Sequence, residues 1–307
     1  MGNDIARIRY RGMARIAHLS DIHFGANDQR IVDAATAWLE ERRPDLIVIS
    51  GDFTQRARVE QFKQAAGWLG RLHAAGLKTL VVPGNHDVPL YDVVRRFGAP
   101  LDRYKRYISH DLCPFYEDRE VAILGLNTAR SLTIKDGRIN HAQMDLLRDR
   151  FAQVPVDKTR ILVTHHPLFS MPIGKGNEWS EAVGQHEDAV RAACEAGVHV
   201  ALAGHFHRTY AEAAQKMVEH SGGALVIQAG TATSTRLRNA EPQSFNWLHV
   251  RRNNEMELQV IVWDGAAFRR ASHVEYRHDG EGWASRDMVD APVVGEVTVA
   301  QMSGGRK

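Results

Sequence analysis

The sequence has little of what defines several large classes of protein. Only two of its 307 residues are cysteine, Cys113 and Cys194, which is too few for a disulfide framework and predicts a protein of the reducing cytoplasm. No apolar run approaches the roughly 18 residues that span a bilayer. The charged first twenty residues lack the apolar stretch of a signal peptide. A net charge of only +2 gives no reason to expect a specific nucleic-acid partner.

Short apolar runs alternate with helix-like stretches through the first two thirds of the chain. Strands are predicted at 15–20, 45–50, 78–82, 121–127, 160–165 and 199–204, and helices at 28–43, 59–76, 141–154 and 187–197. This alternation predicts an α/β fold with a mostly parallel sheet covered on both faces. Four further runs, at 223–234, 244–252, 255–265 and 267–277, predict an antiparallel extension. We expect one domain over residues 13–279, followed by a poorly ordered tail at 280–307.

Polar side chains follow five of the predicted strands, each at the point where the strand ends. These residues are Asp21 and His23, Asp52, Asn85 with His86 and Asp87, His165 with His166, and His205 with His207. In an open α/β sheet the carboxyl ends of the strands face one crevice, where ligands bind. We therefore expect residues spread over most of the chain to converge on one site.

The donor atoms of this set indicate a metal site. Carboxylate and amide oxygens and imidazole nitrogens, without any thiolate, suit Mn, Fe, Zn, Co or Ni. Six or seven donors exceed what one tetrahedral ion needs, so the sequence predicts two metal ions that share a carboxylate. Glycines beside three of the clusters, Gly51, Gly84 and Gly204, allow tight turns and close approach of the backbone.

The ordered pattern D-x-H, G-D, G-N-H-D, H, G-H-x-H resembles the calcineurin-like metallophosphoesterases, and its spacing is similar to the cyclic-nucleotide-phosphodiesterase-like branch. The resemblance covers about residues 13 to 265 and implies a four-layer α/β/β/α sandwich of two mixed sheets. It also implies two divalent or transition metal ions. One would be held by Asp21, His23 and His207, the other by Asn85, His165 and His205, with Asp52 as the bridge. His166 stays open as an alternative to His165.

The resemblance further implies catalytic roles for His86 and Asp87. His86 would stabilise the transition state or protonate the leaving oxygen, and Asp87 would orient it. A hydroxide generated between the ions would attack phosphorus directly, without a phospho-enzyme. The expected activity is hydrolysis of phosphodiesters or related phosphate esters, with cyclic nucleotides as the first guess. The alternatives are a pyrophosphatase of nucleotide-linked substrates such as UDP-2,3-diacylglucosamine and, in another class, a catalytically silent scaffold of this fold.

Three segments outside the motifs bear on the substrate and partners. Arg56 and Arg58 follow the G-D motif and are predicted to bind a second phosphate or a carboxylate of a small phosphate-ester substrate; a solvated start of a helix is the alternative. The basic, aromatic-containing segment 95–108 is read as a plain surface helix, a substrate cap, or a patch that contacts a membrane surface and makes the enzyme peripheral. Residues 168–185 resemble a pocket-shaping mobile loop. The oligomeric state stays open, with a homodimer as one option.

Overall fold

Two mixed sheets form the centre of the molecule. The computed structural model describes residues 12–130, 137–168, 183–213, 223–237, 241–252, 255–280 and 282–287. The seven-stranded sheet has the order β13-β12-β11-β10-β1-β2-β3 and the six-stranded sheet the order β4-β5-β6-β7-β9-β8. The first comprises β13 (Trp283–Asp287), β12 (Phe268–His278), β11 (Glu255–Trp263), β10 (Ser244–Arg251), β1 (Met13–Leu19), β2 (Leu46–Ser50) and β3 (Thr79–Val82). The second comprises β4 (Phe115–Glu117), β5 (Val121–Gly125), β6 (Thr159–Val163), β7 (Val200–Ala203), β9 (Leu225–Gln228) and β8 (Tyr210–Ala213).

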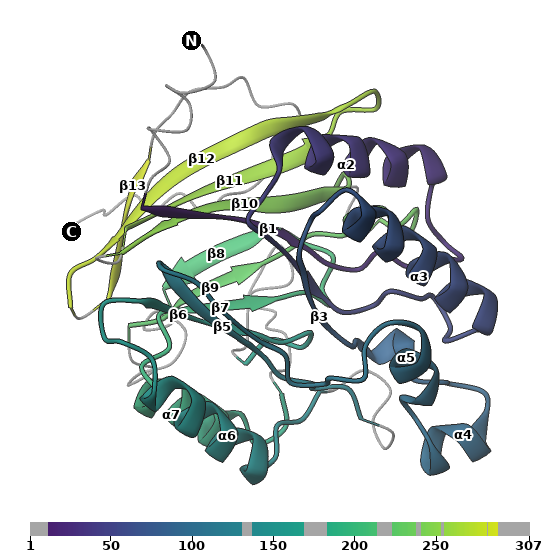
Figure 1. The fold of residues 1–307 in the computed structure, drawn as a ribbon, viewed down its shortest axis with the longest axis horizontal. Helices are drawn as coiled ribbons and strands as arrows, with labels where there is room; N and C mark the ends of the chain where they lie inside the picture. Colours follow the sequence, from purple (N-terminus) through teal and green to yellow (C-terminus); the bar gives the residue numbers. More distant parts are fainter. Residues whose placement is uncertain are drawn as a thin grey trace, which may run out of the picture.

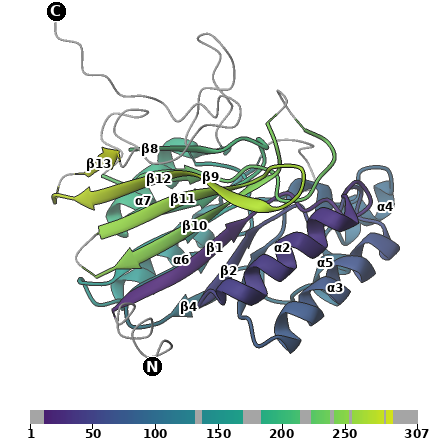
Figure 2. The ribbon, with the colours of Figure 1, turned by 90° about the horizontal axis from the view of Figure 1, so that it is seen from above.

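Helices cover the outer face of each sheet. The helices α2 (Gln29–Arg42) and α3 (Val59–Ala74) lie on the seven-stranded sheet, and α6 (His141–Ala152) and α7 (His186–Glu195) lie on the six-stranded sheet, on the opposite side of the molecule (Figure 1). Figure 2 shows β10 to β12 beside β1, with α2 and α3 next to the parallel strands. The predicted α/β/β/α sandwich is therefore confirmed.

Three apolar layers hold these elements together, and strand periodicity decides which layer each side chain joins. On β2, Leu46 and Val48 belong to the cluster between the two sheets, whereas Ile47 and Ile49 belong to the cluster under α2 and α3. A strand with helices on one side and a second sheet on the other is buried on both faces, so it reads as a continuous apolar run. The third cluster, which includes Leu124 and Leu147, lies under α6 and α7.

The alternation of strands and helices in the sequence predicted a mostly parallel sheet, and the prediction of a single sheet of this kind is wrong. The parallel strands are divided between two sheets: β1, β2 and β3 pair in one, and β5, β6, β7 and β9 in the other. Each sheet covers one face of its partner, which satisfies the same burial requirement. The antiparallel extension is correct in part, because β10 to β13 continue from β1 by antiparallel pairing, whereas β9 joins the other sheet.

The boundary expected at residue 279 is also too early, because β13 pairs with β12 beyond it. The rest of the predicted tail, 288–307, and the part of the predicted loop at 169–182 lie outside the described residues. The segment 95–108 begins within the short helix α4 (Val93–Gly98) and ends just after a second short helix, α5 (Asp102–Tyr107). A turn connects the two helices. Within the described part of the chain, no helix is both long and apolar enough to cross a membrane.

Candidate metal centre

The predicted ligands come together where the carboxyl ends of the parallel strands of one sheet lie next to those of the other. Asp21 and His23 follow β1, Asp52 follows β2, and Asn85 begins the short 3-10 helix η1 (Asn85–Asp87) after β3. From the other sheet, His165 follows β6, and His205 and His207 follow β7. Backbone hydrogen bonds tie the first loops together: Asp21 N donates to Gly51 O at 3.2 Å and His23 N donates to Asp52 O at 2.9 Å.

Most of these residues have an uncommon backbone conformation. Eight described non-glycine residues have a positive φ, and five of them are predicted ligands: Asp21, His23, Asp52, His205 and His207. A left-handed conformation costs a non-glycine residue of order 1–3 kcal/mol and persists only where the surroundings impose it. Contacts with the surrounding structure, rather than the intrinsic backbone preferences of these residues, therefore hold the loops in their conformations.

Asp21, His23 and His207 lie together in one buried group of donor side chains. Nε2 of His23 and Nε2 of His207 are 3.1 Å apart, and Oδ1 of Asp21 is 3.2 Å from His207 Nε2. Nδ1 of His207 donates to Arg236 O at 3.2 Å, which leaves its Nε2 as the nitrogen with a lone pair. Hydrogen-bonding the remote ring nitrogen is the usual way in which a ligand histidine is oriented.

His165, His205 and Asn85 form the second group. Oδ1 of Asn85 lies 3.0 Å from His165 Nε2 and 3.1 Å from His205 Nδ1. Nδ1 of His165 donates to Ser50 O at 2.7 Å, so its Nε2 also presents a lone pair. His166 joins His165 and His205 in a possible three-histidine group, with its own Nδ1 2.8 Å from Thr128 Oγ1. Both histidines of the H-H-P segment therefore lie at the site.

Asp52 lies between the two groups. Its Oδ2 is 3.6 Å from His23 Nε2, and its Oδ1 is 3.5 Å from His165 Nε2. Asp21, Asp52 and His165 also form a group whose ligand atoms lie within 4.8 Å of one another. This is the position that a shared carboxylate must occupy, because one oxygen faces each group.

The donor set fits metal ions in its chemistry and its protonation. Asp21 Oδ1 is buried without a hydrogen-bond donor of acceptable geometry, which is costly unless a cation occupies the space before it. Burial would raise the pKa of Asp21 and of Asp52, but the imidazoles, led by His207 and His165 respectively, outweigh it and lower both pKa values. Burial lowers the pKa of His23, so its ring stays neutral. Ionised carboxylates and neutral imidazoles are the forms that bind metals.

His86 lies beside the first group, but Asp87 does not orient it as predicted. The His86 and His23 rings are 4.9 Å apart between centroids. Nδ1 of His86 donates to the backbone oxygen of Gln55 at 2.8 Å, and the His86 backbone nitrogen donates to Asp52 Oδ1 at 2.8 Å. The sequence did not predict this role for Gln55, nor Ser50 and Arg236 as the hydrogen-bond partners of His165 and His207. For Gln55 the signal in the sequence is its place between the G-D motif and Arg56.

Asp87 instead stabilises the loop that carries the site. Its carboxylate accepts hydrogen bonds from the backbone nitrogens of Phe53, Thr54 and Gly84 at 2.9 to 3.2 Å, and from Thr54 Oγ1 at 3.1 Å. Burial, and then the charge of Asp52, raise the pKa of Asp87 to about 6 despite these bonds. The buried carboxylate joins the loop after β2 to the loop after β3, so its role is positional.

The structure places Arg56 and Arg58 at the rim. Both side chains are exposed, and Arg58 occupies the N-cap of α3. The Arg56 guanidinium lies 5.5 Å from the ring centre of Tyr91. Among the described contacts, neither arginine reaches a predicted metal ligand. Their predicted role toward substrate stays a prediction.

Gly84 allows the loops to approach each other, and this generates a test. A Cβ at this position would overlap Oδ1 and the backbone nitrogen of Asp52. We expect Gly84→Ala to displace Asp52 and to lower both bound metal and hydrolysis by at least about tenfold, because a misplaced bridge weakens both metal sites. Metal content after gel filtration and kcat measure this.

The matched control is Gly67→Ala, in the middle of α3, where a Cβ would meet nothing within 4 Å. It should keep metal and activity and stabilise the protein by about 0.5–1 kcal/mol. Full metal binding by Gly84→Ala would show that the close approach is not needed.

Known proteins resemble the chain in both sequence and fold. A probable cyclic nucleotide phosphodiesterase of Synechococcus is 24% identical over 217 residues, which cover 64% of this chain and 74% of that protein. Another, of Rhodopseudomonas palustris, is 26% identical over 161 residues, 49% of this chain and 56% of that protein. The solved structure of PhoD superposes with a TM-score of 0.71 at 12% identity, covering 94% of this chain and 74% of that one. Residues 14–209 match the family model described as calcineurin-like phosphoesterase, and the chain therefore belongs to this family.

Proposed function

We propose that the protein is a dinuclear-metal-dependent phosphodiesterase that acts on small phosphodiesters of the cyclic-nucleotide type. The observation that carries the proposal is the position of Asp52, which has one oxygen toward His23 and the other toward His165. Two donor groups with a shared carboxylate suit two adjacent divalent cations. The ions we propose are Mn, Fe, Zn or Co.

The protein's own residues would divide the work as follows. One ion would be held by Asp21, His23 and His207. The other would be held by Asn85, His165 and His205, and Asp52 would bind both ions. Bound together, the ions would supply the hydroxide nucleophile and positive charge for the phosphate oxygens. Because His86 Nδ1 keeps its hydrogen in the bond to Gln55 O, Nε2 would face the leaving oxygen. When the ring carries a proton on both nitrogens, the Nε2–H could be transferred to that oxygen, which leaves a neutral imidazole.

The names of the relatives support the diester over other phosphate esters, since two are probable cyclic nucleotide phosphodiesterases. A pyrophosphatase acting on nucleotide-linked substrates is the second candidate. The arginines at the rim favour it, because the guanidinium group binds phosphate with two parallel hydrogen bonds.

A hydrolysis panel separates the two candidates. With Mn²⁺ present, we expect the highest kcat/KM for cyclic nucleotides, lower values for nucleotide-diphosphate lipids, and the lowest for phosphomonoesters. Faster turnover of the nucleotide-diphosphate lipid would favour the pyrophosphatase. Loss of metal by chelation should abolish all of these activities, and a rate that survives complete metal removal would contradict the proposal.

Changes at Asp52 and His86 should have different effects on metal binding. Asp52→Asn should remove both metal and activity, because it weakens the binding of both ions. His86→Ala should keep both ions and lower kcat by roughly 10²–10⁴-fold, the usual contribution of a general acid. Metal analysis and kcat on the same preparations test this. Equal metal loss in the two variants would make His86 a ligand or a structural residue.

Arg56 or Arg58 should bind a substrate group remote from the reacting phosphorus. Such a contact stabilises the bound substrate and the transition state equally, so its loss raises KM more than it lowers kcat. We expect Arg56→Ala or Arg58→Ala to lower affinity for a nucleotide substrate by roughly ten- to a hundred-fold, the equivalent of about 1.5–3 kcal/mol.

A small aryl phosphodiester lacks the remote group, so both variants should hydrolyse it normally. Arg270→Ala, an exposed position on β12, is the control and should change neither substrate's constants. Equal losses on both substrates would place the arginine at the reacting phosphate. No loss on either would leave it as a solvated surface residue.

A further inference from the structure

Exposed apolar side chains are concentrated in one short segment. The described residues include seven exposed large hydrophobic side chains, and five of them lie within residues 90–97: Leu90, Tyr91, Val93, Val94 and Phe97. Val94 is 84% exposed and Tyr91 72%. Scattered exposed hydrophobic residues are ordinary, but a contiguous group marks a surface that contacts something apolar. We call these five residues the apolar tip.

The apolar tip projects because only the other side of α4 is anchored. Arg96 is buried, and its Nη1 donates to Pro89 O at 3.1 Å. The following helix, α5, is attached to the core: Tyr104 packs against Phe53, and Tyr107 stacks on Phe62. In both Figure 1 and Figure 2, α4 lies at the periphery, beyond α5 and α3. The apolar tip therefore lies next to a helix, α5, that is attached to the core.

The longer segment 90–108, which includes the apolar tip and α5, has a net positive charge. Residues 90–108 contain five basic side chains (Arg95, Arg96, Arg103, Lys105, Arg106) and two acidic ones (Asp92, Asp102). Their balance of +3 exceeds the +2 of the entire chain. Arg96 is buried, but the other four basic side chains are at least partly exposed, so positive charge and exposed apolar side chains lie in the same stretch of the chain.

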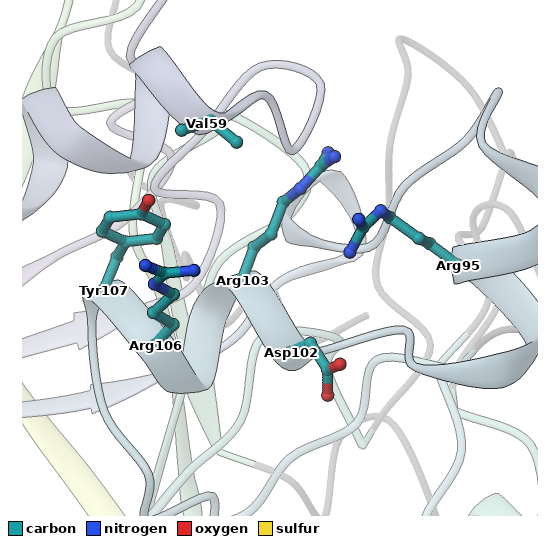
Figure 3. A pocket seen from close by; sticks show the side chains of 6 residues that line it. All are labelled: Val59, Arg95, Asp102, Arg103, Arg106 and Tyr107. Atoms are coloured by element: carbon teal, nitrogen blue, oxygen red, sulfur yellow. The ribbon is translucent and has the colours of Figure 1, made fainter.

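A basic cavity lies at the foot of the tip. It has a volume of about 280 Å³ and is lined by Val59, Arg95, Asp102, Arg103, Arg106 and Tyr107. In Figure 3, Arg95 from α4 and Arg103 from α5 extend toward one another, and Asp102 points away from both. Arg95 and Arg103 both form ion pairs with Asp92, at 3.1 and 3.8 Å, and Arg103 Nη1 also donates to Ala57 O at 2.8 Å. Arg106 instead lies over the ring of Tyr107. No described carboxylate forms an ion pair with Arg106. Arg106 is therefore the arginine of this cavity that is suited to an anionic group such as a phosphate.

We propose that α4 and α5 dock the protein on the surface of an anionic lipid bilayer. The apolar tip would enter the interface, and Arg106 would contact a lipid phosphate. Neither feature suffices alone, because stable attachment to a membrane surface generally needs both an apolar and an electrostatic contribution. Aromatic side chains such as Tyr91 and Phe97 also favour the bilayer interface.

A second copy of the chain fits this face less well. A two-fold interface would bring the same net-positive segment of both copies into one contact, and like charges across an interface are unfavourable. An anionic bilayer offers opposite charge and apolar material at the same place. Tyr91 also contacts Arg56, next to Gln55, which holds His86, so docking would bring the rim of the metal centre to the lipid surface.

Sedimentation with vesicles tests the docking without depending on catalysis. The full-length protein is mixed with vesicles of phosphatidylcholine alone, or with about one third phosphatidylglycerol. We expect binding to the anionic vesicles that weakens as salt increases. Val94→Asp and Phe97→Ser should each lower the partition constant by about tenfold or more. Arg106→Gln should lower it by about fivefold.

Two matched variants control for nonspecific effects of polarity and charge. Val156→Asp changes another highly exposed valine, 87% exposed, and Arg270→Gln removes an exposed arginine from β12. Both should bind vesicles like the parent. Hydrolysis of a soluble aryl phosphodiester should be the same in all five variants, which confirms that each is folded.

Several outcomes would overturn the proposal. These are equal binding to neutral and anionic vesicles, no binding to either, or unchanged binding by Val94→Asp and Arg106→Gln. A dimer in light scattering that Val94→Asp dissociates, without vesicle binding by the parent, would assign the tip to a second copy. Binding of inorganic phosphate without any vesicle binding would make the cavity a soluble-anion site instead.

Discussion

The contact of the Asp52 carboxylate with histidines from both sheets is the interaction on which the centre depends. His23 comes from the seven-stranded sheet and His165 from the six-stranded sheet, and each has a ring nitrogen 3.5 or 3.6 Å from an oxygen of Asp52. The same carboxylate accepts a hydrogen bond from the backbone of His86. The space for it exists because Gly84 has no Cβ. A change at this junction therefore affects the two groups of metal-binding side chains and the position of His86 together.

The site is formed by the packing of the two sheets. Ser50 at the end of β2 accepts a hydrogen bond from His165, and Asp21 accepts one from the backbone nitrogen of His205. Such contacts across the sheets hold several loops in left-handed conformations that their residues would not choose alone. The free energy that stabilises the sandwich therefore also pre-organises the donor atoms, which reduces the reorganisation needed when ions bind.

The surface beside the centre has a different physical origin. α5 is attached by buried aromatic side chains, whereas the outer side of α4 contributes nothing to the core. Apolar side chains that stay largely exposed, such as Val94 and Tyr91, add little to the stability of the folded chain, so their presence needs another explanation, and a lipid surface provides one. Arg56 connects this surface to the rim of the metal centre through its contact with Tyr91.

The sequence alone determined where strands end and which donor types follow them, because apolar runs and turn residues are local signals. From these it predicted the α/β class and the convergence of Asp21, Asp52 and His207 on one site. It did not determine the division into two sheets, since burial on both faces looks the same whether helices or another sheet cover a strand. It also attributed the orientation of His86 to its neighbour Asp87. Only the tertiary structure shows that Gln55 is the hydrogen-bond partner of His86 Nδ1. The partner of a side chain depends on which loops pack together, and this cannot be inferred from distance along the sequence.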